Sequence, residues 1–411
     1  MAPTDTPSLL SDTARVAAMK GNALAQLDFF RASLREDGGF DTLEVDGSPV
    51  PGQPQDLMTT ARLIHSYAIA HIAGAPDCLR IVDAGMAALA TDWPAGHRDA
   101  EHGGYLPIPR DGAPAPSTDK QAYGHVFVLL AAASAKSVGH PDADRLLAEA
   151  AAVIEARFWD EETGRLQDEF RRDWQVFSDY RGMNANMHGV EAFLAAYEAT
   201  GDAVWLTRAG RILDFFTGRV APEHDWRLPE HYRTDWSVDA GYEGNPMFRP
   251  AGTTPGHSLE LGRLLLQYWD LTGRADAALP ERARKLIETA AEGAWREAGG
   301  FAYTLDFDGT PLVTDRYWWP VTEGIGAFAA LAKQGGQASD LDWYARLWQV
   351  SDALFIDAAR GGWFPEVDEA GQPVARMFTG KPDIYHALQA CLFPLAPGLS
   401  GYYRDLKGVL A

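Results

Sequence analysis

Two histidines of this chain each have a glutamate three residues later, at places where a helix should begin. His257 follows Thr254-Pro255, in which threonine suits an N-cap and proline the first helical position. Glu260 would then lie one turn on along the same face, and the pair His188 and Glu191 repeats this spacing. Imidazole exchanges protons near neutral pH, so the pattern predicts acid–base chemistry.

Further candidates of the same kind lie near other expected helix starts. A guanidinium can polarise an oxygen that gains negative charge, and an indole ring can pack on the C–H face of a sugar. These candidates are Arg62, His125, Asn184, Trp319, Glu323 and His386. Structural readings stay open for three of them: a hydrogen-bonded core histidine at His125, an ion pair at Arg62 and core packing at Trp319.

The two histidine–glutamate pairs are also compatible with a metal site. However, no part of the sequence matches an HExxH motif or a cysteine-rich zinc pattern. We therefore expect no metal and no cofactor, and keep metal binding as the alternative.

The elements that position these residues recur at a fixed interval. Six polar segments, about 60 to 75 residues apart, each run into an apolar helix. They are Gln55-Asp56-Leu57, Asp119-Lys120-Gln121, Gly182-Met183-Asn184, Thr254-Pro255-Gly256, Trp319-Pro320-Val321 and Lys381-Pro382-Asp383. His257 and His386 hold similar places in this repeat, so we expect both to face one pocket.

Hydrophobic patterning separates the helices into two layers. The six repeated helices are apolar on all sides, as in Val126–Leu130, whereas their partners, such as Trp205–Val220, have one apolar and one charged face. With the N-terminal segment Asp12–Leu34, this gives twelve helices. The sequence predicts an all-α (α/α)6 barrel formed by residues 1–411 as a single domain, and a tandem of two helical domains is the alternative.

Four connections share a glycine pair followed by an aromatic residue. They are Gly38-Gly39-Phe40, Gly103-Gly104-Tyr105, Gly299-Gly300-Phe301 and Gly361-Gly362-Trp363. Each precedes a short alternating stretch and a turn, which predicts small β-hairpins. These hairpins should lie at the active-site end of the barrel, beside the N-termini of the inner helices.

Composition narrows the class of partner. The 36 Lys and Arg against 57 Asp and Glu give a net charge of -21, which argues against nucleic acid and favours a neutral small molecule. Cys78 and Cys391 lie far apart without a disulfide pattern, and the apolar run Val126–Ala135 is too short to span a membrane. We expect a cytoplasmic protein without a membrane or nucleic-acid partner, as a monomer or homodimer.

Three stretches resemble a known family. Tyr180–His188, Arg249–Glu260 and Gly380–Gln389 are similar to segments of the N-acylglucosamine 2-epimerase superfamily, and within it to the mannose isomerase and aldose–ketose isomerase branch. The resemblance extends from about Asp56 to Leu392. It implies the same six-fold α/α barrel that the repeat predicts.

The resemblance also implies an activity and a site. The activity is metal-independent interconversion of D-mannose and D-fructose through a cis-enediol, with D-lyxose and D-xylulose as a further pair. His257, His386 and Arg62 match the catalytic residues of the family. His188, Glu260 and Trp319 match its sugar pocket, and we add Asn184, Glu323 and His125 as substrate-binding candidates. We expect His386 to move the proton between C2 and C1 and His257 to move protons on the oxygens, although the two roles can be exchanged.

Three other functions remain open at this point. A sugar 2-epimerase would return the proton to the opposite face of C2 and convert mannose to glucose. An (α/α)6 glycoside hydrolase would use two carboxylates, from a set that includes Asp168, Glu191, Glu260 and Glu323. A non-catalytic sugar-binding protein would bind without turnover.

Overall fold

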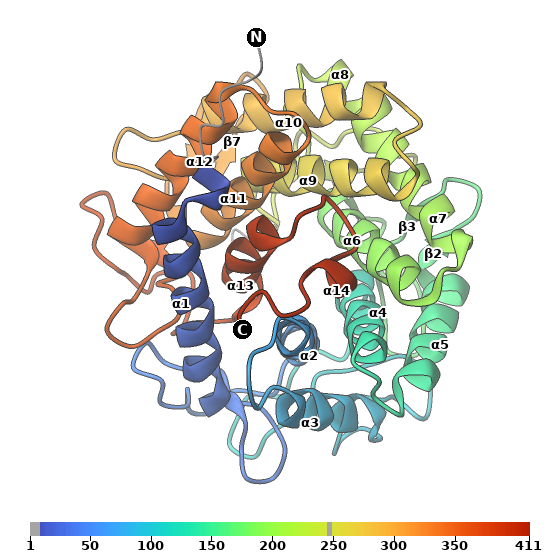
Figure 1. The fold of residues 1–411 in the computed structure, drawn as a ribbon. Helices are drawn as coiled ribbons and strands as arrows, with labels where there is room; N and C mark the ends of the chain where they lie inside the picture. Colours follow the sequence, from blue (N-terminus) through green and yellow to red (C-terminus); the bar gives the residue numbers. More distant parts are fainter. Residues whose placement is uncertain (1–8, 245–248) are drawn as a thin grey trace.

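The computed structural model describes residues 9–244 and 249–411. Six inner helices form a closed ring in which each contacts the next, and the last contacts the first (Figure 1). They are α2 (Leu57–Ile72), α4 (Ala122–Ser137), α6 (Met183–Thr200), α9 (Pro255–Leu271), α11 (Trp318–Lys333) and α13 (Tyr385–Leu392). The predicted (α/α)6 barrel is confirmed.

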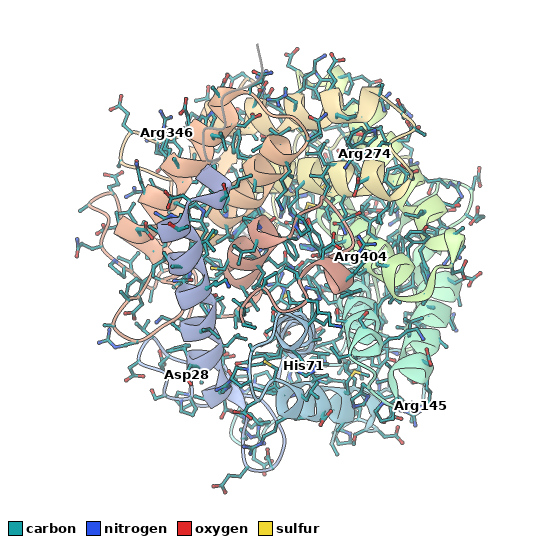
Figure 2. All side chains as sticks on the ribbon, in the orientation of Figure 1. Asp28, His71, Arg145, Arg274, Arg346 and Arg404 are labelled. Carbon is teal, nitrogen blue, oxygen red and sulfur yellow. The ribbon has the colours of Figure 1, made fainter. Side chains whose placement is uncertain are left out.

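Six amphipathic helices surround this ring, each packed against one inner helix. They are α1 (Thr13–Phe30), α3 (Leu79–Ala90), α5 (Ala143–Val153), α7 (Ala203–Leu213), α10 (Ala278–Ala294) and α12 (Ala338–Val350). Charged side chains such as Arg145 of α5 and Arg346 of α12 project from the periphery (Figure 2). By contrast, Val126 to Ala133 of α4 are buried on every side, as the two-layer prediction requires.

At the mouth of the barrel, short strand pairs and single bridges form a second ring. The residues just before each inner helix pair with the connection that leads to the next inner helix. Three of these contacts are strand pairs, β1 (Lys120–Gln121) with β4 (Glu169–Phe170), β5 (Arg181–Gly182) with β6 (His231–Tyr232), and β9 (Arg316–Tyr317) with β10 (Glu366–Val367). The other three are the single bridges Gln55–Ile108, Thr253–Leu305 and Lys381–Leu43. Hydrogen bonds therefore fix the position of every helix start relative to its neighbour.

Three of the four predicted hairpins form. One joins β7 (Thr304–Leu305) to β8 (Pro311–Val313), and single bridges close the turns after Leu43 and Val367. The prediction is wrong after Gly103-Gly104, where Ile108 exchanges both of its backbone hydrogen bonds with Gln55 of another connection. A further hairpin, β2 (Trp159–Asp160) with β3 (Arg165–Leu166), follows α5.

The C-terminal segment closes the opposite end of the barrel. It includes α14 (Tyr402–Asp405), and its red ribbon lies over the centre in Figure 1. Backbone N–H groups of Gly408 and Leu410 donate to Ile72 and Ala73 at the end of α2. In the part of the chain that the structure describes, the mouth beside the N-termini of the inner helices is then the end open to a substrate.

Two predicted helix starts differ in detail from the structure. Thr254 holds the N-cap position of α9 and Pro255 the first helical one, but the Thr254 hydroxyl makes no capping bond. The sixth inner helix begins at Tyr385, two residues after Asp383, because the Asp383 carboxylate accepts a bond from the Tyr385 N–H and so acts as a local cap.

In the described ranges, no helix has the length and apolarity needed to cross a lipid bilayer.

Candidate active site

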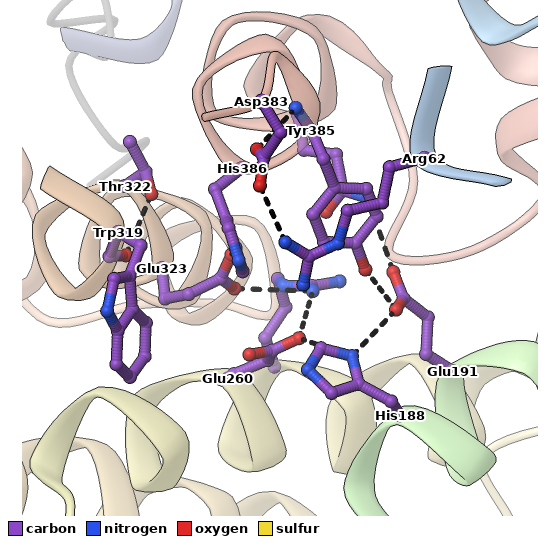
Figure 3. Close-up of polar contacts among 12 residues, drawn as sticks. Arg62, His188, Glu191, Glu260, Trp319, Thr322, Glu323, Asp383, Tyr385 and His386 are labelled. Carbon is purple, nitrogen blue, oxygen red and sulfur yellow. Dashed lines mark hydrogen bonds and ion pairs between the residues drawn. The ribbon is translucent and has the colours of Figure 1, made fainter. Parts of the chain in front are cut away.

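The first turns of the inner helices bring the predicted residues to one buried place. Arg62 comes from α2, His188 from α6, Trp319 from α11 and His386 from α13, and Figure 3 shows their side chains converging. His257 of α9 joins them through its ring contact with Trp319. We call these five residues, together with Glu191, Glu260, Glu323, Asp383 and Tyr385, the central cluster.

Each catalytic candidate histidine is held by a carboxylate. Nδ1 of His386 lies 2.8 Å from Glu323 Oε1, and Nδ1 of His257 lies 2.9 Å from Glu230 Oε1. A carboxylate accepts, so Nδ1 carries the proton in both rings. Nε2 is then the nitrogen with which each histidine can meet a substrate.

The indole of Trp319 lies near both histidines. Its ring centre is 5.0 Å from that of His257 and 5.9 Å from that of His386, with interplanar angles of 33° and 36°. A Cβ atom added at Gly256 would come within 2.4 Å of this indole, so the glycine makes room for it. Core packing alone does not describe Trp319, because its indole also contacts both imidazoles.

Arg62 is fixed on several sides. Its guanidinium donates to Asp383 Oδ2 at 2.6 Å and to the Tyr123 hydroxyl at 3.0 Å. The rings of Phe127 and Tyr385 lie 4.6 and 4.7 Å from its central carbon. Burial opposes the charge, but Tyr123 and Asp383 raise the pKa of Arg62 overall, so it stays cationic. The ion pair that the sequence left open is present, and Nε remains without a protein partner.

Glu260 is the least satisfied group of the cluster. It is fully buried, and neither carboxylate oxygen has a hydrogen-bond partner. Its Oε1 lies 3.6 Å from Nδ1 of His188 and 4.0 Å from Arg263. Burial and the nearby charges of Glu323 and Glu191 raise the pKa of Glu260 well above the usual range. The protonated carboxyl can donate to, or accept from, a ligand hydroxyl.

His188 and Glu191 form the other predicted pair. His188 Nδ1 lies 3.3 Å from Glu191 Oε2, and Glu191 also accepts from the Tyr385 hydroxyl and, at 3.2 Å, from Gln389. Burial alone would raise the pKa of Glu191, but the bond from His188 and the charge of Arg263 lower it. Burial lowers the pKa of His188 to about 4, so this ring is neutral at physiological pH.

Two sets of ligand atoms in the cluster are close enough to hold a metal ion. Within the described residues, they are His188, Glu191 and Glu260, and Glu260, Glu323 and His386, each set lying within 4.8 Å. Arg263 donates to Glu323 at 3.3 Å, and His386 occupies the other oxygen of that carboxylate. Glu191 and Glu323 are thus already hydrogen-bonded, whereas Glu260, which belongs to both sets, is not. The charges of Arg62 and Arg263 disfavour a further cation.

A cavity of about 480 Å³ lies beside the central cluster. Tyr123 and Asn184 line it, and Tyr123 also bonds Arg62, so the cavity and the cluster share a wall. Oδ1 of Asn184 is buried without a protein partner, as expected for a substrate-binding residue. The two catalytic candidate histidines are not part of the lining, so the cavity adjoins the reacting centre and is not identical with it.

His125, a predicted substrate-binding residue, lines the cavity and is bonded to the backbone. Its Nδ1 donates to the Gln121 carbonyl at 2.7 Å, and its Nε2 accepts from the Tyr105 N–H at 3.1 Å. Burial lowers its pKa to about 4, which fits this neutral form. Both ring nitrogens are engaged, so we assign the residue to the wall of the cavity.

Four residues of the site were missed in the sequence. Tyr123, Arg263 and Tyr385 lie on inner helices, so the repeat itself could have indicated them. Glu230 had no such signal, because it lies in a connection, 27 positions before the histidine that it holds. The strand pairing places it in the same register as Asp168, another buried carboxyl, whose pKa burial raises to about 7.

Comparison with known proteins gives the same classification as the geometry. The N-acylglucosamine 2-epimerase (GlcNAc 2-epimerase) family matches residues 38–390. The chain belongs to this family. It is 42% identical over 408 residues to a D-mannose isomerase of Thermobifida fusca, covering 95% of this chain and 98% of the relative. It is 39% identical to a D-mannose isomerase of Pseudomonas cannabina pv. alisalensis, covering 92% of each chain.

A solved structure supports the same relationship. The crystal structure of a D-mannose isomerase superposes with a TM-score of 0.83 at 27% identity, covering 92% of this chain and 97% of that one. The family that the sequence motifs suggested is therefore confirmed.

Proposed function

We propose that this protein is an aldose–ketose isomerase that interconverts D-mannose and D-fructose through a cis-enediol. The observation that carries the proposal is the pair of carboxylate-held histidines, His257 and His386, with one indole near both. Histidine is the side chain whose ordinary pKa suits reversible proton transfer near neutral pH. The relatives named D-mannose isomerase supply the substrate.

The proton on C2 of the open-chain aldose passes to Nε2 of His386. The C–H electron pair forms the C1=C2 double bond, and O1 of the aldehyde takes up the charge of an enediolate. The same imidazole then returns its proton to C1 while the proton of the O2–H group passes to O1, which gives the ketose with its carbonyl at C2. Glu323 stabilises the transient imidazolium from the Nδ1 side, as a carboxylate does in other histidine-dependent sites.

Arg62 and His257 act on the oxygens. The guanidinium of Arg62 is held by Asp383 and Tyr123, so it can meet the developing charge on O1 and O2 without reorganisation. His257, held by Glu230, opens the sugar ring and moves protons between the oxygens. Glu260 and His188 contact the remaining hydroxyls.

Two alternative activities, a sugar 2-epimerase and a glycoside hydrolase, are distinguished from the isomerase by different observations. A 2-epimerase would use much of the same cluster and differ in its product from mannose. A glycoside hydrolase would use two carboxyls; Tyr385 and His386 bind Glu191 and Glu323, whereas Glu260 has no partner. The relatives named D-mannose isomerase favour the isomerase over this alternative.

The decisive experiment is proton NMR of the protein with D-mannose in D₂O, with and without EDTA. Fructose in both samples, with deuterium at C1 or C2, would support metal-independent enediol chemistry. Glucose as the main early product would identify the protein as a sugar 2-epimerase instead. Loss of turnover in the presence of EDTA would indicate that one of the two carboxylate–histidine sets binds a metal ion.

The cytoplasmic location and the monomer or homodimer state stay predictions.

A further inference from the structure

Basic side chains near the mouth bear on whether the sugar can carry a negative group. The sequence offers five there, and a phosphate or sulfonate would need at least one of them free. In the structure each contacts a carboxylate of the protein. The pairs are Arg110 with Asp41, Arg171 with Asp119 at 3.3 Å, Arg172 with Asp99 at 3.0 Å, Arg249 with Glu169 at 2.6 Å and Lys381 with Asp357 at 2.9 Å.

Arg249 matters most, because it faces the 480 Å³ cavity. It is the one Lys or Arg among the described residues that line this cavity. Both of its terminal nitrogens bond Glu169, at 3.2 and 2.6 Å, and its central carbon lies 3.9 Å from the ring centre of Tyr180. The bidentate contact with Glu169 therefore balances the charge of the guanidinium and uses one N–H of each terminal nitrogen before any ligand arrives.

The remaining charged groups that line the cavity are acidic. They are Asp56, Asp119 and Asp168. Asp119 is paired with Arg171, while Asp56 and Asp168 accept bonds from the backbone N–H groups of Thr59 and Gly182. An anion in this cavity would meet like charges and no unpaired cation, which is an arrangement that rejects a wrong ligand by repulsion.

The cavity also lies where the far end of a sugar would extend. Tyr123 contacts Arg62 with its hydroxyl and lines the cavity with the same side chain. In the proposed mechanism Arg62 holds the O1 and O2 edge. A hexose bound there continues past Tyr123 towards Asn184, whose buried Oδ1 has no protein partner.

We infer that this cavity receives the end of the sugar remote from C1, and that Glu169 and Asp119 make it selective for uncharged substrates by occupying the guanidinium groups of Arg249 and Arg171. The inference rests on the proposed isomerase function and adds a specificity-determining pair to it. Release of Arg249 from Glu169 should convert the cavity from one that repels an anion to one that binds it.

The test compares D-mannose with D-mannose 6-phosphate in the wild type, Glu169→Gln and Asp119→Asn. We expect the ratio of kcat/KM for the 6-phosphate to that for D-mannose to rise about tenfold or more in Glu169→Gln, as one new charge-assisted bond would give. Asp119→Asn should act in the same direction through Arg171. The gain should disappear in the double variant Glu169→Gln/Arg249→Gln.

Glu161→Gln is the matched control, because Glu161 pairs with Arg211 on the outer surface. It should leave the ratio unchanged. A wild type that uses both sugars equally, or folded Glu169→Gln and Asp119→Asn proteins with the wild-type ratio, would overturn the inference.

Calorimetric binding of inorganic phosphate gives a readout that needs no turnover. Glu169→Gln should bind phosphate more tightly than the wild type, and equal affinities would again count against the inference. A wild type that leaves D-mannose unchanged rejects the proposed function instead, and the phosphate measurement still decides the charge selectivity of the cavity.

Discussion

Lys120 and Lys381 at the mouth of the barrel are as deeply buried as Arg62 and Glu260 in its centre. At the mouth, each lysine forms an ion pair with an aspartate, Lys120 with Asp99 and Lys381 with Asp357. We call these two contacts the rim pairs. The rim pairs and the central cluster both place charge out of reach of water, which is unfavourable unless the groups are paired.

The two regions differ in how completely their polar atoms are bonded. The ammonium of Lys120 has three protons and three acceptors, namely Asp99, the Gly103 carbonyl and the Arg172 carbonyl. Asp99 in turn accepts from Arg172 and from backbone N–H groups. These bonds outweigh burial and lower the pKa of Asp99. Lys120 therefore has no donor left for a ligand, and Lys381 donates two of its three protons to Asp357 and the Gly361 carbonyl.

The central cluster keeps bonding capacity in reserve. Neither oxygen of Glu260 has a partner, and the same is true of Arg62 Nε and Asn184 Oδ1. Unsatisfied buried polar atoms are rare in stable proteins and are tolerated where a ligand completes them. A buried charge alone thus does not identify a site in this barrel, whereas a buried carboxyl with both oxygens unpartnered, as in Glu260, indicates one.

The sharpest contrast should come from His386→Asn in the central cluster. It removes the proposed base, so we expect kcat with D-mannose to fall by about 10²- to 10⁴-fold while the melting temperature changes little. Steady-state kinetics and thermal denaturation test this. His71→Asn, at the exposed end of α2, is the control and should retain full activity. Near-normal turnover of His386→Asn would end its assignment as the base.

Lys120→Met should show the opposite pattern at the rim. It leaves Asp99 buried without its countercharge, which is expected to lower the free energy of unfolding by about 3–5 kcal/mol. The folded protein should keep its kcat within a few-fold. Urea denaturation measures the loss, and Lys285→Met, in an exposed pair with Glu281, should lower it by at most about 1 kcal/mol. Equal losses of stability in the two variants would mean that the buried rim pair stabilises the fold no more than an exposed pair does, which would contradict its structural role.

Glu230→Gln tests a residue that acts through His257. The amide can donate to Nδ1 and favour the other tautomer, so kcat should fall on the order of 10²-fold without loss of stability. The acid limb of the pH profile of kcat/KM should also move to lower pH, because the imidazolium loses its countercharge. Glu161→Gln on the surface should change neither quantity. An unaltered pH profile would reduce Glu230 to a packing role.

Glu260→Gln should have a distinctive dependence on pH. The pKa of Glu260 is raised by burial, so the folded protein holds a proton that the unfolded chain releases above its ordinary carboxyl range. Stability from this group is present at low pH and is lost as pH rises, by up to about 1.4 kcal/mol per pH unit. The stability of Glu260→Gln relative to the wild type should therefore increase between about pH 5 and pH 8. A difference that stays constant with pH, as expected for exposed Glu281→Gln, would show that Glu260 is ionised in the folded state.

Local patterns explain why so much of the fold could be predicted. A helix that is apolar on every side must be covered on every side, and that property is visible in Val126–Leu130 without any partner. The repeat then places His257 and His386 in similar first turns, and a closed ring directs them to one centre. The failed hairpin after Gly103-Gly104 marks the limit, because its strand pairs with a segment about fifty residues away.

The sequence by itself thus determined the barrel, the end that carries the site and the residue types that meet there. Only the tertiary structure decided which polar atoms are already bonded: His386 to Glu323, 63 positions away, His257 to Glu230, and Arg249 to Glu169. The physical reason is that helix periodicity depends on neighbours within a few residues. The saturation of a donor or acceptor depends on every group that the fold brings within about 3 Å of it, and this separates a structural ion pair from a site that can still bind a ligand.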